Sequence, residues 1–211
     1  MRVRLLIRAW VVLSCVVLSP GIAPPITGSA PNHPAPAPPG KPERIYFQAF
    51  GDFPASAVAE ITDRYLYVDG LRTEILSPRP LPAHTVDPAR RQVISEELLQ
   101  FMRKENSRLA ADPRNVIIGF TTLDMYPRKL DWAYAWAWRE WRVGVISTAR
   151  LDPTWYGEPA DPSLLRLRFR KVVAKTVGLL FYRLPVNDNP RSALYHALST
   201  VQDIDRVSED F

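Results

Sequence analysis

The chain has 211 residues, 46% hydrophobic and 23% charged, which is enough to bury one ordinary core without metal or disulfide help. The formal net charge of +5 includes three arginines within the first eight residues, so the rest of the chain is close to neutral. Because no basic run is interleaved with aromatic residues, nucleic-acid binding has little support. The single cysteine, Cys15, excludes a disulfide framework and a cysteine metal cluster.

The first 30 residues have the pattern of an export signal. After the arginines, residues 9–18 form an apolar stretch too short for a comfortable membrane-spanning helix, and small residues follow around Ser29 and Ala30. We therefore expect residues 1–30 to be a signal peptide, with an uncleaved N-terminal anchor as the alternative. Cys15 lies inside the apolar stretch rather than at its end, which disfavours a lipoprotein signal. The domain is then exported, whether periplasmic, secreted or envelope-anchored.

Residues 31–42 are rich in proline and alanine and show no apolar periodicity, which predicts an extended linker before a folded domain over residues 43–211. Hydrophobic periodicity and turn residues predict the elements of that domain. In chain order they are a strand over 44–50, a helix from Pro54 to about Tyr67, a strand over 71–76, an amphipathic helix from Asp87 and Pro88 to Leu109, strands over 115–120, 132–138 and 142–148, and a helix that starts at Asp161 and Pro162 and ends before Pro185. Strands interleaved with helices favour an α+β fold in which a mixed sheet packs against helices.

Four short segments in the domain carry a recognisable pattern. They are Arg91-Gln92, similar to an Arg-Gln-Tyr signature; residues 118–126, similar to Gly-x-Thr-x-x-Asp-Leu-Tyr; residues 144–151, similar to a strand ending in Ser-x-x-Arg-Leu; and Asp203 with Asp205, similar to an acidic pair. In this order and spacing the segments resemble the archaemetzincins, a family of metzincin-type zinc peptidases. The resemblance implies a zincin-like fold, with the catalytic helix after Asp161.

That family's zinc motif is His-Glu-x-x-His-x-x-Gly-x-x-His. Two histidines four apart project from one helix face onto one metal, and the glutamate activates the metal-bound water. The resemblance places the motif on Lys171 and Lys175 for the first two histidines, Val172 for the glutamate, Gly178 for the glycine and Phe181 for the third histidine, with Leu194 near the Met-turn methionine. Because ammonium groups repel a dication and valine cannot act as a base, we expect no catalytic residue, no metal and no cofactor.

The remaining histidines do not supply another metal site. His33 falls in the linker, and neither His84 nor His196 has a ligand-spaced neighbour. Gly178 leaves two interpretations open, a remnant of the metzincin turn or a tolerated glycine inside a longer helix. Such a glycine costs about 1 kcal/mol relative to alanine.

Two sets of side chains form a candidate binding surface. Lys171 and Lys175 share a helix face and could attract an anion, although solvation or pairing with carboxylates such as Asp124 or Asp205 is the favoured interpretation. Trp136 and Trp138 continue an aromatic stripe that could bind a peptide or sugar, while core packing is favoured for Trp132 and Tyr134. The arginines at 166, 168 and 170 predict a solvated helix face with one or two ion pairs, or an acidic partner's surface.

Together these observations predict an exported, catalytically inactive archaemetzincin-like domain. Its expected role is to bind a peptide or protein in the cleft at the motif positions, or to serve as a structural domain. We expect no nucleic-acid partner, and membrane contact only through an uncleaved N-terminal segment. The alternative is a hydrolase of the same family with residual or altered peptidase activity.

Overall fold

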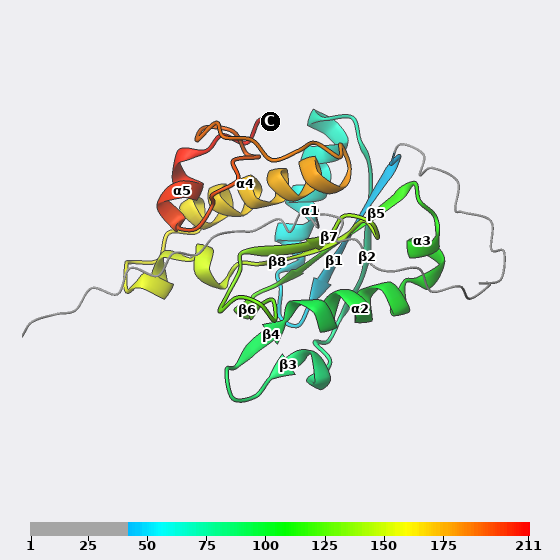
Figure 1. Cartoon of the computed structure of the whole chain (residues 1–211), viewed down its shortest axis with the longest axis horizontal. Helices are drawn as coiled ribbons and strands as arrows, with labels where there is room; N and C mark the ends of the chain where they lie inside the picture. The colour runs from blue at the N-terminus through cyan, green and yellow to red at the C-terminus, as the bar shows by residue number, and fades with distance from the viewer. Residues whose placement is uncertain (1–41) are drawn as a thin grey trace, which may run out of the picture.

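The structure, a computed structural model, describes residues 42–211, so the expected signal peptide and all but the last residue of the expected linker lie outside the described residues. Five strands form a mixed central sheet in the order β2-β1-β5-β8-β7, in which β7 alone runs antiparallel to its neighbour (Figure 1). Their bounds are Arg44–Phe50 (β1), Arg72–Arg79 (β2), Asn115–Thr121 (β5), Ala135–Trp138 (β7) and Val143–Ser147 (β8). A small second sheet joins β3 (Val86–Asp87), β4 (Gln92–Ile94) and β6 (Met125–Tyr126).

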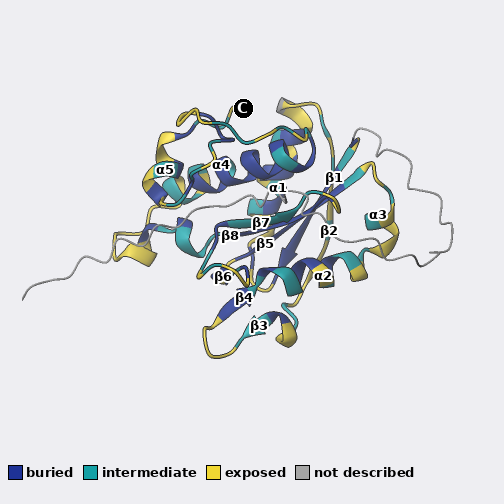
Figure 2. Cartoon of the chain, viewed as in Figure 1, coloured by how far each residue is buried: buried dark blue, intermediate teal, exposed yellow. Residues whose placement is uncertain are grey.

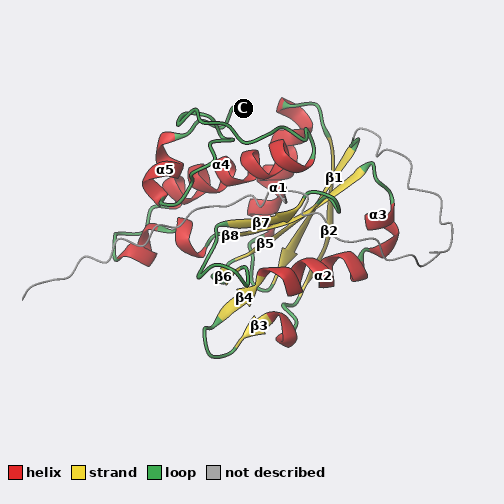
Figure 3. Ribbon diagram, viewed as in Figure 1, coloured by secondary structure: helices red, strands yellow, loops and turns green. Residues whose placement is uncertain are grey.

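Helices cover both faces of the central sheet (Figure 3). They are α1 (Ala55–Asp63), α2 (Ser95–Glu105), α3 (Ser107–Ala111), α4 (Pro162–Leu180) and α5 (Val201–Arg206). On the face covered by α1 and α4, Phe120 and Val173 belong to one buried apolar cluster. On the face covered by α2, Met102 and Val145 belong to a second cluster. This arrangement confirms the expected α+β fold with a mixed sheet packed between helices.

Burial separates the central strands from the edge strand (Figure 2). Strands β1, β5 and β8 are buried along almost their whole length, as expected for strands covered on both faces. Strand β2 lies at the edge and is mostly exposed, and it carries Arg72, Pro78 and Arg79. Charged residues and a proline at an edge disfavour pairing with another chain.

Two sequence expectations were wrong in their details. The helix expected directly after Pro88 begins only at Ser95, because Val93 and Ile94 pair in β4 with Met125 and Tyr126. The expected strand over 132–138 is regular only in β7. In the first case a local helical period gave way to pairing with a strand about 32 residues away, which sequence spacing does not encode. In the second, only residues 135–138 pair with the neighbouring strand β8.

Helix α4 forms where expected, and its start has a clear local cause. The Asp161 carboxylate accepts hydrogen bonds from the main-chain N–H groups of Ser163 and Leu164, and Pro162 occupies the first turn. A side chain at Gly144 of β8 would place its Cβ 3.0 Å from Leu180 of α4, so the glycine permits close packing of the helix on the sheet.

Candidate functional site

The residues that the resemblance assigns to the zinc motif lie together on α4 and the segment that covers it. We call this set the motif cluster: Lys171, Val172, Lys175, Gly178, Phe181 and Leu194. Each residue other than the glycine has at most 7% of its surface exposed. The C-terminal segment, which includes α5, lies along α4 on the side away from the sheet (Figure 1). The cluster is therefore enclosed between α4 and the end of the chain.

The two lysines connect α4 to that segment through main-chain oxygens. Lys171 Nζ donates hydrogen bonds to the carbonyl oxygens of Asp205, at 2.8 Å, and Ile204, at 3.1 Å. Both carbonyls belong to the last turn of α5, where helix geometry leaves them without an intrahelical donor. Lys175 Nζ donates to the carbonyl oxygen of Tyr195, at 2.5 Å. Both ammonium groups thus bridge α4 and the C-terminal segment.

The charges around Lys171 are arranged by burial and by a neighbouring ion pair. Burial lowers the pKa of the Lys171 ammonium from its usual value, and the negative charge of Asp205 opposes that shift. The Asp205 carboxylate itself accepts two 2.8 Å hydrogen bonds from Arg168, which is also buried. Asp205 therefore binds Lys171 through its main-chain carbonyl oxygen and Arg168 through its side-chain carboxylate.

The other cluster residues pack rather than offer polar groups. Val172 and Phe181 belong to the apolar cluster under α1 and α4. Helix α4 continues through Gly178 without a left-handed turn and ends at Leu180. A Cβ on Gly178 would lie 2.7 Å from the Phe211 ring and 2.9 Å from Leu194, so the glycine makes room for both side chains. Of the two interpretations of Gly178, the structure agrees with a glycine inside the helix.

These residues do not fit a zinc ion. Two protonated amines and a phenyl ring stand where three nitrogen ligands are needed, and the amines already direct hydrogens to carbonyl oxygens. Within residues 42–211, no group of three or more His, Cys, Asp or Glu side chains is placed to hold a metal. His196 contacts Asp188 at 3.1 Å near the surface, and His84 packs edge-on against Phe101.

The tryptophans of the candidate binding surface lie on the opposite face of the sheet from α4. Trp136 and Trp138 are partly buried and pack on the apolar cluster under α2, and Trp138 contacts Trp141 edge to face. Trp141 is 45% exposed and lies under the guanidinium of Arg103, 3.6 Å from its ring centre. Because the two lysines lie on the far side of α4, the sheet separates them from these tryptophans. Ligand binding by either set stays a prediction.

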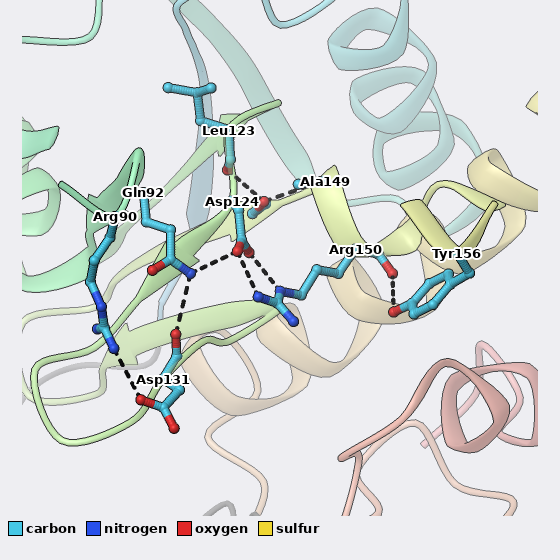
Figure 4. A network of polar contacts seen from close by, with 9 residues as sticks. Arg90, Gln92, Leu123, Asp124, Asp131, Ala149, Arg150 and Tyr156 are labelled. Atoms are coloured by element: carbon cyan, nitrogen blue, oxygen red, sulfur yellow. Dashed lines mark hydrogen bonds and ion pairs between the residues drawn. The ribbon is translucent and has the colours of Figure 1, made fainter. Parts of the chain in front are cut away.

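A polar network joins three of the segments that carry the family resemblance (Figure 4). The buried carboxylate of Asp124 accepts two hydrogen bonds from Arg150, both at 2.8 Å, and one from Gln92 Nε2 at 2.7 Å. The guanidinium of Arg150 also lies over the rings of Trp132 and Trp155. Sequence reasoning marked these segments as a signature but did not foresee their contact. An acidic residue in the loop three residues after a buried strand was the available signal.

The network lines a large open cavity at the carboxyl ends of the parallel strands. The cavity has a volume of about 1270 Å³ and lies between the starts of α1 and α4, the turn before β4 and the loops after β5 and β8. The motif cluster does not line it. Within residues 42–211, no helix is both long and apolar enough to cross a membrane.

Comparison with known proteins agrees with the geometry. An archaemetzincin from Pyrococcus furiosus is 27% identical over 167 residues, which cover 75% of this chain and 83% of the relative. An archaemetzincin from Pyrococcus abyssi is 30% identical over 121 residues, covering 56% of this chain and 61% of the relative. No family model matches the chain.

Solved structures show the same fold. A zinc-dependent peptidase from Methanocorpusculum labreanum superposes with a TM-score of 0.66 at 22% identity, covering 79% of this chain and 95% of that one. An archaemetzincin from Methanopyrus kandleri superposes with a TM-score of 0.65 at 24% identity, covering 82% of this chain and 91% of that one. In sequence and in fold alike, the chain is similar to the archaemetzincins.

Proposed function

We propose that this protein is a non-catalytic archaemetzincin, exported from the cytoplasm, that acts as a binding or structural domain. The observation that carries the proposal is the set of hydrogen bonds from Lys171 and Lys175 to carbonyl oxygens of the C-terminal segment. At the same positions, by the resemblance, a peptidase of this family holds metal ligands. In this chain the lysines at those positions instead join α4 to the C-terminal segment through ammonium hydrogen bonds.

The chemistry of the remaining positions supports the proposal. Metal-assisted peptide hydrolysis needs a base beside the metal-bound water, and Val172 has no group that accepts a proton. Phe181 adds a buried ring rather than a third nitrogen ligand. A ligand could reach the motif cluster only if the C-terminal segment moved, because that segment covers both ammonium groups. Binding of a peptide or protein in this cleft therefore requires displacement of residues 195–211.

Export rests on the sequence of residues 1–30 alone. The three arginines and the following apolar stretch support a signal peptide or N-terminal anchor. Fractionation of cells that produce the full chain, with N-terminal sequencing of the recovered protein, tests both the location and the cleavage. A cytoplasmic protein that keeps its first residue would contradict export.

Metal analysis tests the loss of catalysis. The purified chain, incubated with zinc and then desalted, should retain well under one zinc per chain, whereas the zinc-dependent peptidase from Methanocorpusculum labreanum serves as the positive control. Stoichiometric zinc would refute the proposal. A peptidase activity that survives chelation and disappears in Lys175→Ala would favour the alternative, a hydrolase with altered chemistry.

A gain-of-function variant tests the motif register. The combined substitutions Lys171→His, Val172→Glu, Lys175→His and Phe181→His rebuild the family motif around Gly178. If the register is right, the folded variant should take up zinc that the unmodified chain does not, because histidines at 171 and 175 project from one helix face onto one metal. The third histidine reaches that metal only if the chain turns at Gly178, which is helical in this structure. A folded variant that takes up no zinc would contradict the assignment of these positions.

A further inference from the structure

The cavity at the carboxyl ends of the parallel strands is separate from the motif cluster, and its charged residues are not all paired with one another. Eight charged residues line it, four arginines and four carboxylates. Most of them are matched within the protein. Arg150 binds Asp124 and Arg90 binds Asp131. Of the remaining carboxylates, Glu60 lies 3.4 Å from the guanidinium of Arg170, and Asp152 accepts two hydrogen bonds from Thr154.

Two arginines are left over at the cavity wall. Arg91 and Arg166 are exposed, and neither has a hydrogen bond or ion pair with any other residue of the described range 42–211. They come from different elements, Arg91 from the turn before β4 and Arg166 from the first two turns of α4. The expected ion pairs of the arginine-rich helix face are made by Arg168 and Arg170 instead. The cavity thus has two guanidinium groups without a carboxylate partner on separate walls, while the Asp152 carboxylate is bound only by the neutral Thr154.

The main chain holds one of these arginines in an unusual conformation. Arg91 has a φ of +53°, in the left-handed region that residues other than glycine, asparagine and aspartate seldom adopt. The turn around it is fixed from one side by Asp87, whose carboxylate accepts hydrogen bonds from the N–H groups of Ala89 and Arg90. A strained position that carries an unpaired cation into a cavity is typical of a residue kept for its contacts.

The rest of the wall is largely apolar and aromatic. Phe53 and Phe169 pack together on its inner side, with ring centres 5.5 Å apart. Leu123 is 41% exposed and Trp155 is 47% exposed, and both line the same cavity. The volume exceeds the range of about 300–1000 Å³ usual for small-molecule pockets. An elongated ligand with apolar side chains and a negative end fits these properties better than a small metabolite.

We propose that this cavity binds a peptide by its C-terminal carboxylate, which Arg91 and Arg166 contact, while the last apolar side chains lie against Phe53, Phe169 and Trp155. A planar guanidinium can bind both oxygens of a carboxylate, which gives orientation as well as affinity. The proposal rests on the proposed function only in that it names a site and a ligand class for the binding role, and it does not depend on the loss of catalysis.

The test uses fluorescein-labelled hexapeptides whose last two residues are leucine, phenylalanine or valine, prepared as free acids and as C-terminal amides. Binding to the domain is followed by fluorescence anisotropy. We expect the free acids to bind at least ten times more tightly than the amides. The variant that combines Arg91→Asn with Arg166→Gln should weaken free-acid binding at least tenfold, since asparagine tolerates the left-handed turn.

Arg108→Gln is the matched control. Arg108 is an exposed arginine of α3 that lies outside the cavity, and its variant should bind like the unmodified protein. Equal binding of acids and amides, unchanged binding by the folded double variant, or no binding by any peptide would each overturn the proposal. Mass spectrometry of the recovered peptides separates the two proposals. Carboxylate-dependent binding with cleavage would keep this site and refute the non-catalytic role.

Discussion

Replacing Lys171 by methionine tests whether its ammonium group holds the C-terminal segment in place. The substitution keeps an unbranched side chain of similar bulk and removes the donor of two hydrogen bonds, to Asp205 O and Ile204 O. Hydrogen bonds from charged groups contribute about 1.5–3 kcal/mol each. The relief of a buried cation offsets part of that sum, because burial disfavours the charged form. We expect a net loss of about 2 kcal/mol, which for a domain of this size lowers Tm by about 4–8 °C.

The assay is urea unfolding followed by circular dichroism, with Lys104→Met as control. Lys104 is exposed in the last turn of α2, and its substitution should change the free energy of unfolding by less than about 0.5 kcal/mol. A Lys171→Met variant as stable as the unmodified protein would refute a net stabilising cross-link, because it would show that this buried ionic group can be replaced without loss.

The same pair of proteins makes a pH prediction. Because burial lowers the pKa of Lys171 in the folded chain, the unfolded chain binds this proton more tightly. Between the lowered pKa and the usual value of 10.5, the stability of the unmodified protein should therefore rise with pH relative to Lys171→Met. A difference that falls over this interval would contradict the assigned direction of the shift.

Three further predictions concern other parts of the structure. Gly178→Ala should destabilise the domain by about 1 kcal/mol, because overpacking against Phe211 exceeds the gain in helix propensity. The loss of stability should be smaller in a Phe211→Ala background. Equal losses in both backgrounds would indicate a backbone requirement at this position instead. Asp124→Asn should lower the free energy of unfolding by about 3 kcal/mol, because it leaves the guanidinium of Arg150 without its carboxylate. Calorimetry should then show a Tm lower by about 6–12 °C. A change below about 1 kcal/mol would contradict a structural role for the pair. Hydrogen bonds from Arg114 lower the pKa of the Asp112 carboxyl from 3.8 to about 2, so its carboxyl resonance should titrate near pH 2. The stability that this ion pair adds is present above pH 3.8 and lost as pH falls through about 2. Titration near 3.8 would show that the pair does not form in solution.

Much of the fold could be predicted because its elements have strong local signals. Residues 44–50 and 115–120 are nearly continuous apolar runs bounded by turn residues, and both became central strands. Helix α4 begins at an aspartate and a proline, and the side chain of Asp161 makes the expected cap. Such signals act within a few residues, so they are legible without knowledge of the tertiary contacts.

The contacts of the site were not predictable in the same way. The sequence places Lys171 and Lys175 on one helix face, but their partners are main-chain oxygens 20–34 residues away, which any residue type could supply. Likewise the bond between Gln92 and Asp124 joins positions 32 residues apart. The cavity forms where five separate elements come together at one end of the sheet. The hydrophobic periodicity of each element does not predict this arrangement.

A short C-terminal segment needs specific contacts to stay on α4. Helix α5 has only six residues, too few to be stable alone. Contacts at three places along α4 hold the C-terminal segment. Arg168 binds Asp205 near its start, the two lysines hold carbonyl oxygens along its middle, and the Phe211 ring packs on Gly178 near its end. The two lysine contacts cover the motif positions themselves. The same residues that remove the zinc chemistry therefore also build the closed face, which favours a stable non-catalytic domain and leaves the cavity at the other side of α4 as the accessible site.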